Sequence, residues 1–147
     1  MSVTVRRLAP ADKAAWEILF EGYAEFYGVP QTQQMRETVW GWLHDPDHGS
    51  MCFVAEQDGE VIGFTHFRPF VSQLRALTNG FLDDLFVDPA TRGSGAVQAL
   101  IDAVSEHGRT EGWGTIRWIT ADDNYRARGV YDKLATRTGW ITYDIKL

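Results

Sequence analysis

The sequence predicts a mixed α/β fold, with a mostly antiparallel sheet of about six or seven strands and helices on both of its faces. The chain of 147 residues is long enough for one domain with a sizeable core, which we place over residues 1–147. The expected order is a strand, two helices, three strands, a helix, a strand, a helix and a strand. The strand–helix–strand run over residues 81–121 favours a right-handed parallel crossover, and Asp58-Gly59 favours an antiparallel hairpin.

The N-terminal third predicts one strand and two helices. Residues 2–8 alternate and form the first strand, and Asp12 is the expected N-cap of the first helix. Thr32 is expected to cap a second helix that runs to about His44. Each helix has an apolar stripe, for which a role in the core is favoured over a role in a substrate slot. The stripes consist of Trp16, Phe20, Tyr23 and Tyr27, and of Met35, Val39, Trp40 and Leu43.

The middle of the chain predicts a hairpin and then a central strand. Residues 51–56 and 60–70 are the hairpin strands, and residues 71–78 are either a loop or a frayed strand edge. Asn79-Gly80 indicates a turn just before the strand over residues 81–87, which stops at Asp88-Pro89.

The segment that follows the central strand has the character of an anion site. Arg92-Gly93-Ser94-Gly95 is a loop with little side-chain bulk, and a helix over residues 95–111 begins directly after it. Unpaired N–H groups and the helix dipole at such a junction attract a phosphate, and glycine lets the ligand approach the backbone.

The C-terminal part predicts a strand over residues 116–121, a helix over 124–136 and a last strand over 140–147. An unpaired last strand would be an edge available to a second copy, so a homodimer is expected.

Composition excludes several classes of protein. A formal net charge of −6 argues against a nucleic-acid partner and permits a cationic substrate such as an amine. No apolar run is long enough for a membrane span, and no signal peptide is visible, so no membrane partner is expected.

The single cysteine, Cys52, fits a reducing cytoplasm and is expected to be a small buried side chain. The four histidines show no pattern of metal ligands, so no metal is expected. His66 either lines an acceptor site or is structural, with the structural role favoured.

Two motifs resemble the GNAT superfamily of N-acetyltransferases. Arg92 to Val97, after a strand ending in Val-Asp-Pro, is similar to that family's acetyl-CoA loop, although Val97 stands where the family has Gly or Ala. Asn124, Ala127 and Tyr131 match its Asn-x-x-Ala-x-x-x-Tyr pattern. The strand over residues 82–87 is similar to that of diamine acetyltransferases, so the resemblance is nearest to the polyamine, thialysine and histone-type branch.

The resemblance implies acetyl transfer from acetyl-CoA, a co-substrate, to a primary amine of a small molecule or a lysine side chain. It implies that Leu85, Phe86 and Val87 run beside the pantetheine arm. Arg92, Gly93, Ser94, Gly95, Ala96 and Val97 would hold the diphosphate, and Asn124 would bind the pantetheine or order the start of its helix.

Acetyl transfer also needs a proton donor for the departing thiolate and a neutral amine. Asn124 and Tyr131 are seven residues apart and share one helix face, a spacing that by itself favours a core tyrosine. The resemblance favours Tyr131 as the general acid instead, because a tyrosine hydroxyl can donate its proton to sulfur. Asp83 stands at the position of the family's Glu, so the resemblance implies that it is the base, directly or through a water. Asp84 is the second choice, because adjacent strand residues face opposite sides of a sheet. No base is needed if enough amine is neutral. The alternative is a module on the same fold that binds acetyl-CoA or a protein without catalysis, which Val97 favours slightly.

Overall fold

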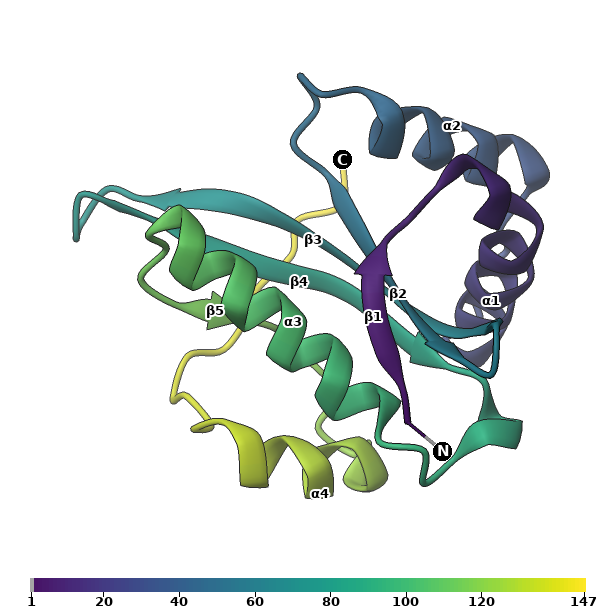
Figure 1. Ribbon diagram of the computed structural model, residues 1–147. Coiled ribbons are helices and arrows are strands. Elements are labelled where there is room, and N and C mark those ends of the chain that lie inside the picture. The colour runs from purple at the N-terminus through teal and green to yellow at the C-terminus, as the bar shows by residue number, and fades with distance from the viewer. Residues whose placement is uncertain (1) are drawn as a thin grey trace.

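The structure is a computed structural model that describes residues 2–147, and it is built on one five-stranded sheet (Figure 1). The strand order is β1-β2-β3-β4-β5. Neighbouring strands from β1 to β4 are antiparallel, and β5 lies parallel to β4. The strands are β1 (Thr4–Arg7), β2 (Met51–Gln57), β3 (Glu60–Ser72), β4 (Leu77–Val87) and β5 (Ile116–Arg117). The mixed, mostly antiparallel sheet is confirmed, with five strands where six or seven were expected.

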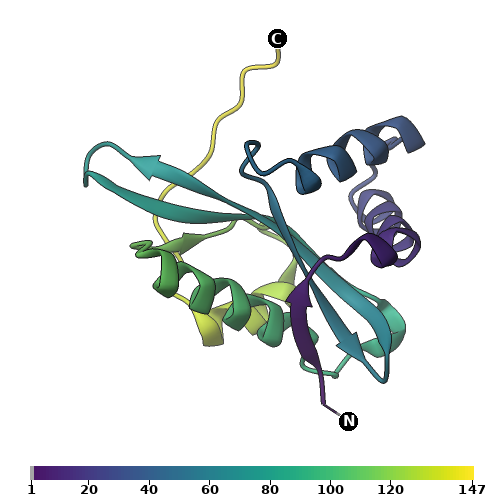
Figure 2. The ribbon, with the colours of Figure 1, turned by 45° about the horizontal axis from the view of Figure 1, so that its top comes forward.

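Helices cover both faces of this sheet, as expected (Figures 1 and 2). The helices α1 (Lys13–Phe26) and α2 (Gln33–His44) pack on one face, which we call the α1 face. The helices α3 (Ala96–Glu111) and α4 (Tyr125–Leu134) pack on the other, the α3 face. Two short 3₁₀ turns, η1 (Pro10–Asp12) and η2 (Pro89–Thr91), lead into α1 and toward α3. No helix within residues 2–147 is both long enough and apolar enough to cross a membrane.

The two faces have separate cores because strand side chains alternate between them. On the α1 face, Trp16 and Phe20 of α1 are buried against Val54 and Phe64 of the sheet. On the α3 face, Ile101 and Val104 of α3 are buried against Phe67 and Leu82. The first half of the α1 aromatic stripe is therefore core, as favoured from the sequence.

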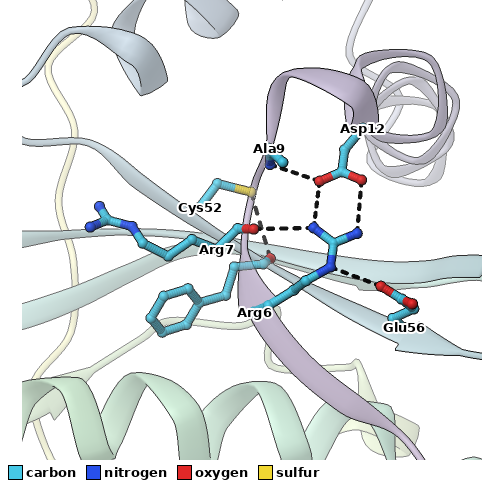
Figure 3. Close-up of polar contacts among 7 residues, drawn as sticks. Arg6, Arg7, Ala9, Asp12, Cys52 and Glu56 are labelled. Carbon is cyan, nitrogen blue, oxygen red and sulfur yellow. Dashed lines mark hydrogen bonds and ion pairs between the residues drawn. The ribbon is translucent and has the colours of Figure 1, made fainter. Parts of the chain in front are cut away.

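A cluster of charged side chains joins β1, η1 and β2 (Figure 3). The Arg6 guanidinium donates to both oxygens of Asp12, at 2.7 and 2.9 Å, and to Glu56 Oε2 at 2.8 Å. Asp12 Oδ2 also accepts from the Ala9 backbone N–H at 2.7 Å. The Asp12 side chain makes no capping bond to α1, so this residue fixes the entry to the helix through Arg6 instead.

The β3–β4 hairpin is longer than expected, and the turn predicted at Asn79-Gly80 is wrong. Both residues lie inside β4, where Gly80 pairs with Pro69 of β3 and Ile116 of β5. Glycine is required there for close packing, since a Cβ on Gly80 would lie 2.4 Å from the Trp113 ring. A glycine that admits a neighbouring ring has the same local sequence signature as a turn glycine.

The C-terminal strand predictions are also wrong. The strand expected over residues 116–121 is confined to Ile116 and Arg117, and residues 135–147 form no helix or strand. The last residues run away from the sheet in an extended path (Figure 2). An alternating pattern makes a strand only where a neighbouring edge supplies hydrogen bonds, and residues 135–147 pair with no strand of their own chain.

Candidate active site

The residues that the sequence predicted for cofactor binding surround one cavity of about 470 Å³. The cavity lies at the C-terminal end of β4, between the loop before α3, the end of α1 and one side of α4. Its lining includes every residue of the predicted cofactor set together with the predicted acid, namely Leu85, Phe86, Val87, residues 92–97, Asn124 and Tyr131. Segments separated by up to about 45 positions in the chain therefore meet where the sequence motifs require them to meet.

Two glycines in the left-handed conformation shape the loop from Arg92 to Val97. Gly93 and Gly95 have φ angles of 83° and 84°, in the left-handed region that side chains disfavour. Gly95 is the N-cap of α3, and Ser94 Oγ accepts from the Ala96 N–H at 3.3 Å. The N-terminus of a helix of 16 residues thus borders the cavity. Arg92 and Arg126 add two cationic side chains to the lining, which suits a diphosphate.

Val97, the departure from the family's loop pattern, takes part in two contacts. It lines the cavity, and it also packs against the buried cluster of Phe67, Leu82, Ile101 and Val104 on the α3 face. Its branched side chain therefore contributes to the core beneath the loop as well as to the cavity wall.

Asn124 and Tyr131 reach the cavity from α4. Asn124 is the N-cap of this helix, and its Oδ1 accepts from the Ala127 N–H at 3.4 Å. The Tyr131 ring lies edge-on to Trp118 with ring centroids 5.4 Å apart. Burial, followed by the proximity of Tyr27, raises the pKa of Tyr131. The phenol consequently keeps its proton through the neutral range, as a proton donor must.

The far half of the α1 aromatic stripe lines the cavity, and Tyr23 also packs against the core of the α1 face. Tyr23, Phe26 and Tyr27 form part of the wall opposite α4. Burial raises the pKa of Tyr23, and so do the charge of Asp84 and a hydrogen bond to it. The four aromatic residues of the stripe share one periodicity, so the sequence did not indicate that Tyr23 and Tyr27 border the cavity while Trp16 and Phe20 lie only in the core.

The two candidate base residues lie on the same face of the sheet, contrary to expectation. The register between β3 and β4 shifts after Leu82, which pairs with Phe67, so that Asp84 pairs with His66 and Asp83 is the extra residue of a β-bulge. Leu82 and Leu85 both pack on the α3 face, and two residues instead of one lie between them. The assumption of strict alternation at Asp83 and Asp84 was wrong because a bulge inserts a residue without changing faces.

The two carboxylates have different surroundings. Asp83 accepts from Arg68 Nε at 3.0 Å, and both side chains are partly exposed. Burial is the largest influence on Asp83 and raises its pKa, while Arg68 opposes the change. Asp84 Oδ2 lies 2.8 Å from Nδ1 of the buried His66. Asp84 also faces Tyr23 in the cavity wall, whereas the titratable neighbours of Asp83 are Arg68, Asp84 and His66.

Other reactive side chains lie outside this constellation. Cys52 is buried as expected, and burial raises the pKa of its thiol. The His44 ring lies tilted against Trp40 of α2, and the His48 ring stacks on Trp42. Within residues 2–147, no group of three or more His, Cys, Asp or Glu side chains is arranged to hold a metal ion.

Comparison with known proteins decides the family. The family model described as the acetyltransferase (GNAT) family matches residues 16–135. The chain belongs to the GNAT family. It is accordingly an acetyl-CoA-dependent N-acetyltransferase, and the cavity at the end of β4 is the candidate site for that chemistry.

Three curated relatives agree with this membership. The uncharacterised N-acetyltransferase YhfO of Bacillus subtilis is 31% identical over 96% of this GNAT chain and 95% of its own length. The D-amino-acid N-acetyltransferase HPA3 of Saccharomyces cerevisiae is 26% identical over 96% of this chain and 89% of its own. The aminoglycoside N(6')-acetyltransferase type 1 of Stenotrophomonas maltophilia is 32% identical over 74% of this chain and 69% of its own.

Proposed function

We propose that this GNAT enzyme acetylates a primary amine of a small molecule. Tyr131 is the general acid, and one carboxylate of the Asp83–Asp84 pair accepts the proton of the amine. The observation that carries the proposal is the meeting of the loop over residues 92–97, Tyr131 and the wall of Tyr23 and Tyr27 around one cavity. A non-catalytic acetyl-CoA binder would need the same loop, but it would not need a phenol and a carboxylate pair near the same cavity.

The cavity has the features that acetyl-CoA requires. The left-handed Gly93 and Gly95, the α3 N-terminus and the cations Arg92 and Arg126 suit its diphosphate. Residues 85–87 at the end of β4 offer strand backbone to its pantetheine arm. When bound, acetyl-CoA supplies an acetyl group activated as a thioester.

The residues of this chain then move two protons. The amine nitrogen forms a bond to the acetyl carbon while the carbon–sulfur bond breaks, and the nitrogen must lose a proton to a base. Tyr131 holds the proton that the leaving sulfur receives, and its raised pKa keeps that proton in place until transfer. The proton gained by the carboxylate returns through solvent to the tyrosine oxygen, so the enzyme ends in its starting state.

The acceptor is a small cationic molecule such as an amino-acid-like amine or a polyamine. Two adjacent carboxylates on one face and an acidic chain with a formal net charge of −6 favour attraction of an ammonium group. The names of the relatives point to D-amino acids and aminoglycosides as amine classes handled by related enzymes. A panel of polyamines, amino acids, aminoglycosides and a lysine peptide, assayed for release of the CoA thiol, tests the acceptor and the diamine-type branch together.

The decisive experiment is Tyr131→Phe, which removes the hydroxyl and keeps the ring against Trp118. We expect turnover to fall by roughly 10²- to 10⁴-fold, the usual contribution of a positioned proton donor, with acetyl-CoA affinity by calorimetry little changed. Tyr125→Phe on the same helix is the matched control, because Tyr125 is 75% exposed. Unchanged turnover in Tyr131→Phe removes this residue from the mechanism, and tight acetyl-CoA binding without transfer to any amine supports the binding module.

The chain is also proposed to form a homodimer through its C-terminal segment. Trp140, Ile141, Tyr143 and Ile145 are between 73% and 88% exposed, and Ile141, Tyr143 and Ile145 alternate as in a strand. The sheet ends at β5, so one chain contains both a strand-like segment and an edge that could receive it. A second copy supplies both parts reciprocally, which satisfies a two-fold interface.

Sedimentation analysis tests the dimer. We expect the full chain to sediment at twice the chain mass, and Ile141→Glu with Ile145→Glu to sediment as a monomer. Thr142→Glu, between the apolar positions, is the control that keeps the dimer. A monomeric full chain contradicts the proposal.

A further inference from the structure

We infer that His66 is the positioning residue of the proton-accepting carboxylate, and that Trp16 holds it in the single tautomer this role requires. The inference deepens the proposed function, on which its kinetic part rests, because it selects Asp84 from the carboxylate pair. It stands on two hydrogen bonds that connect Trp16 of the α1 core to His66 and His66 to Asp84, which faces Tyr23 of the cavity wall.

The series of hydrogen bonds begins at Trp16, whose side chain is completely buried beneath α1. Its Nε1–H donates to Nε2 of His66 at 2.9 Å. An indole nitrogen is only ever a donor, so Nε2 of His66 must be the acceptor and carries no proton. The one imidazole proton therefore lies on Nδ1.

Nδ1 of His66 lies 2.8 Å from Oδ2 of Asp84, to which it donates. Each nitrogen of the ring is thus committed to one partner. A second proton, on Nε2, would point directly at the Trp16 N–H and break the contact between two buried groups. With its single proton on Nδ1, the imidazole orients Asp84 without neutralising the negative charge of the carboxylate.

Aromatic side chains and the neighbouring strand hold the His66 ring in place. Its ring contacts Phe20 edge-on at 4.9 Å and Phe64 at 4.7 Å between centroids, and its strand partner across β2 is Cys52. Only about 7% of the side chain is exposed, against 26% for Asp84. The chain of donors therefore leads from a dry core to a carboxylate that solvent or an amine can reach.

Asp84 stands where such support is useful. It faces Tyr23 of the cavity wall, and Tyr23 in turn lies close to Tyr27 and Tyr131. Asp83, one residue away on the same face, is bound instead by the partly exposed Arg68. A carboxylate held by a neutral donor keeps its capacity to bind an ammonium and to take its proton, whereas one paired with a guanidinium has that charge already compensated. Asp84 is therefore the base, and His66 and Trp16 act through it.

Nitrogen-15 NMR of the full chain reports the tautomer directly. We expect His66 to show a protonated Nδ1 and an unprotonated Nε2 at neutral pH, because the Trp16 N–H donates to Nε2 and Asp84 accepts from Nδ1. The His66→Asn spectrum assigns its signals among the four histidines. In Trp16→Phe, which lacks the indole N–H, we expect Nε2 to become available to a second proton. A wild-type His66 that is protonated on Nε2 at neutral pH overturns the inference, whatever the enzyme acetylates.

Kinetics of two His66 variants test whether the positioning is used. His66→Leu removes both hydrogen bonds, and we expect kcat/KM for the amine to fall on the order of tenfold or more while acetyl-CoA affinity stays unchanged. His66→Asn restores a side-chain N–H near Asp84, and we expect it to recover much of the loss. If both variants fold, as thermal unfolding would show, and lose activity equally, or if neither loses it, His66 is only structural. A wild-type chain that binds acetyl-CoA but transfers to no amine is instead a failure of the proposed function, and the NMR result is unaffected by it.

Discussion

The two faces of β4 carry different kinds of side chain, and the difference separates stability from chemistry. On the α3 face, Leu82 and Leu85 pack against the apolar side of α3. On the α1 face, Asp83 and Asp84 lie together, and Phe86 follows against α1. The bulge at Asp83 creates this contrast, because it places two carboxylates side by side without exposing the leucines. One strand can therefore hold the sheet to a helix and also present a reactive pair to the adjoining cavity.

The largest effect on activity is expected when each of the two carboxylates is replaced in turn. Asp84→Asn keeps the shape of the side chain but cannot take a proton, so we expect kcat/KM for the amine to fall by roughly 10²- to 10⁴-fold. Asp83→Asn is the matched variant on the same face. We expect its kcat/KM to fall by less than about tenfold, because Asp83 is already paired with Arg68. Steady-state kinetics with the best amine of the panel measures both. A greater loss in Asp83→Asn would return the base to the residue first predicted from the sequence.

A substitution on the α3 face should have the opposite consequence. Ile101→Ala removes buried apolar atoms next to Leu82 and leaves a cavity, so we expect the free energy of unfolding to fall by about 2–5 kcal/mol. Turnover per folded molecule should remain close to that of the wild type, because Ile101 does not line the cavity. Urea unfolding and kinetics on the same sample make the comparison. A loss of turnover as large as in Asp84→Asn would mean that the α3 face also serves the chemistry.

The smallest effect concerns a charged pair beside the α1 face that serves structure alone. Hydrogen bonds from Arg6, and then from the Ala9 N–H, lower the pKa of Asp12 in the folded chain despite its burial. Asp12→Asn should lower the free energy of unfolding by about 1–2 kcal/mol at neutral pH, because Arg6 remains partly in solvent.

The pH dependence of that loss follows from the direction of the shift. The stabilisation by Asp12 is complete above the ordinary aspartate value of about 3.9 and disappears as the pH falls through the lower value of the folded state. The difference in stability between wild type and Asp12→Asn should therefore shrink only in acid, as unfolding at a series of pH values would show. Asp102→Asn on the exposed side of α3 is the control. A difference that stays constant in acid would mean that the ionised pair is not its source.

Local patterns in the sequence determined most of the fold and the loop and α4 residues of the cavity lining. Thr32 caps α2 as expected, with its hydroxyl accepting from the Met35 N–H, and Gly112 ends α3 in the left-handed conformation. The loop over residues 92–97 and the Asn124–Tyr131 spacing predicted residues that line one cavity. These features depend on neighbours within one or two helical turns, so the sequence contains the information that sets them.

Tertiary structure alone decided the bulge at Asp83, the shortened β5, the absence of a last strand over residues 140–147 and the bonds from Trp16 through His66 to Asp84. Each depends on a partner at least 15 residues away or on the edge of a sheet. A bulge has no signature of its own in the alternation of side chains, and an edge strand forms only where another edge completes its hydrogen bonds. The chemistry of the face therefore depends on a one-residue shift in strand register, which only the assembled sheet specifies.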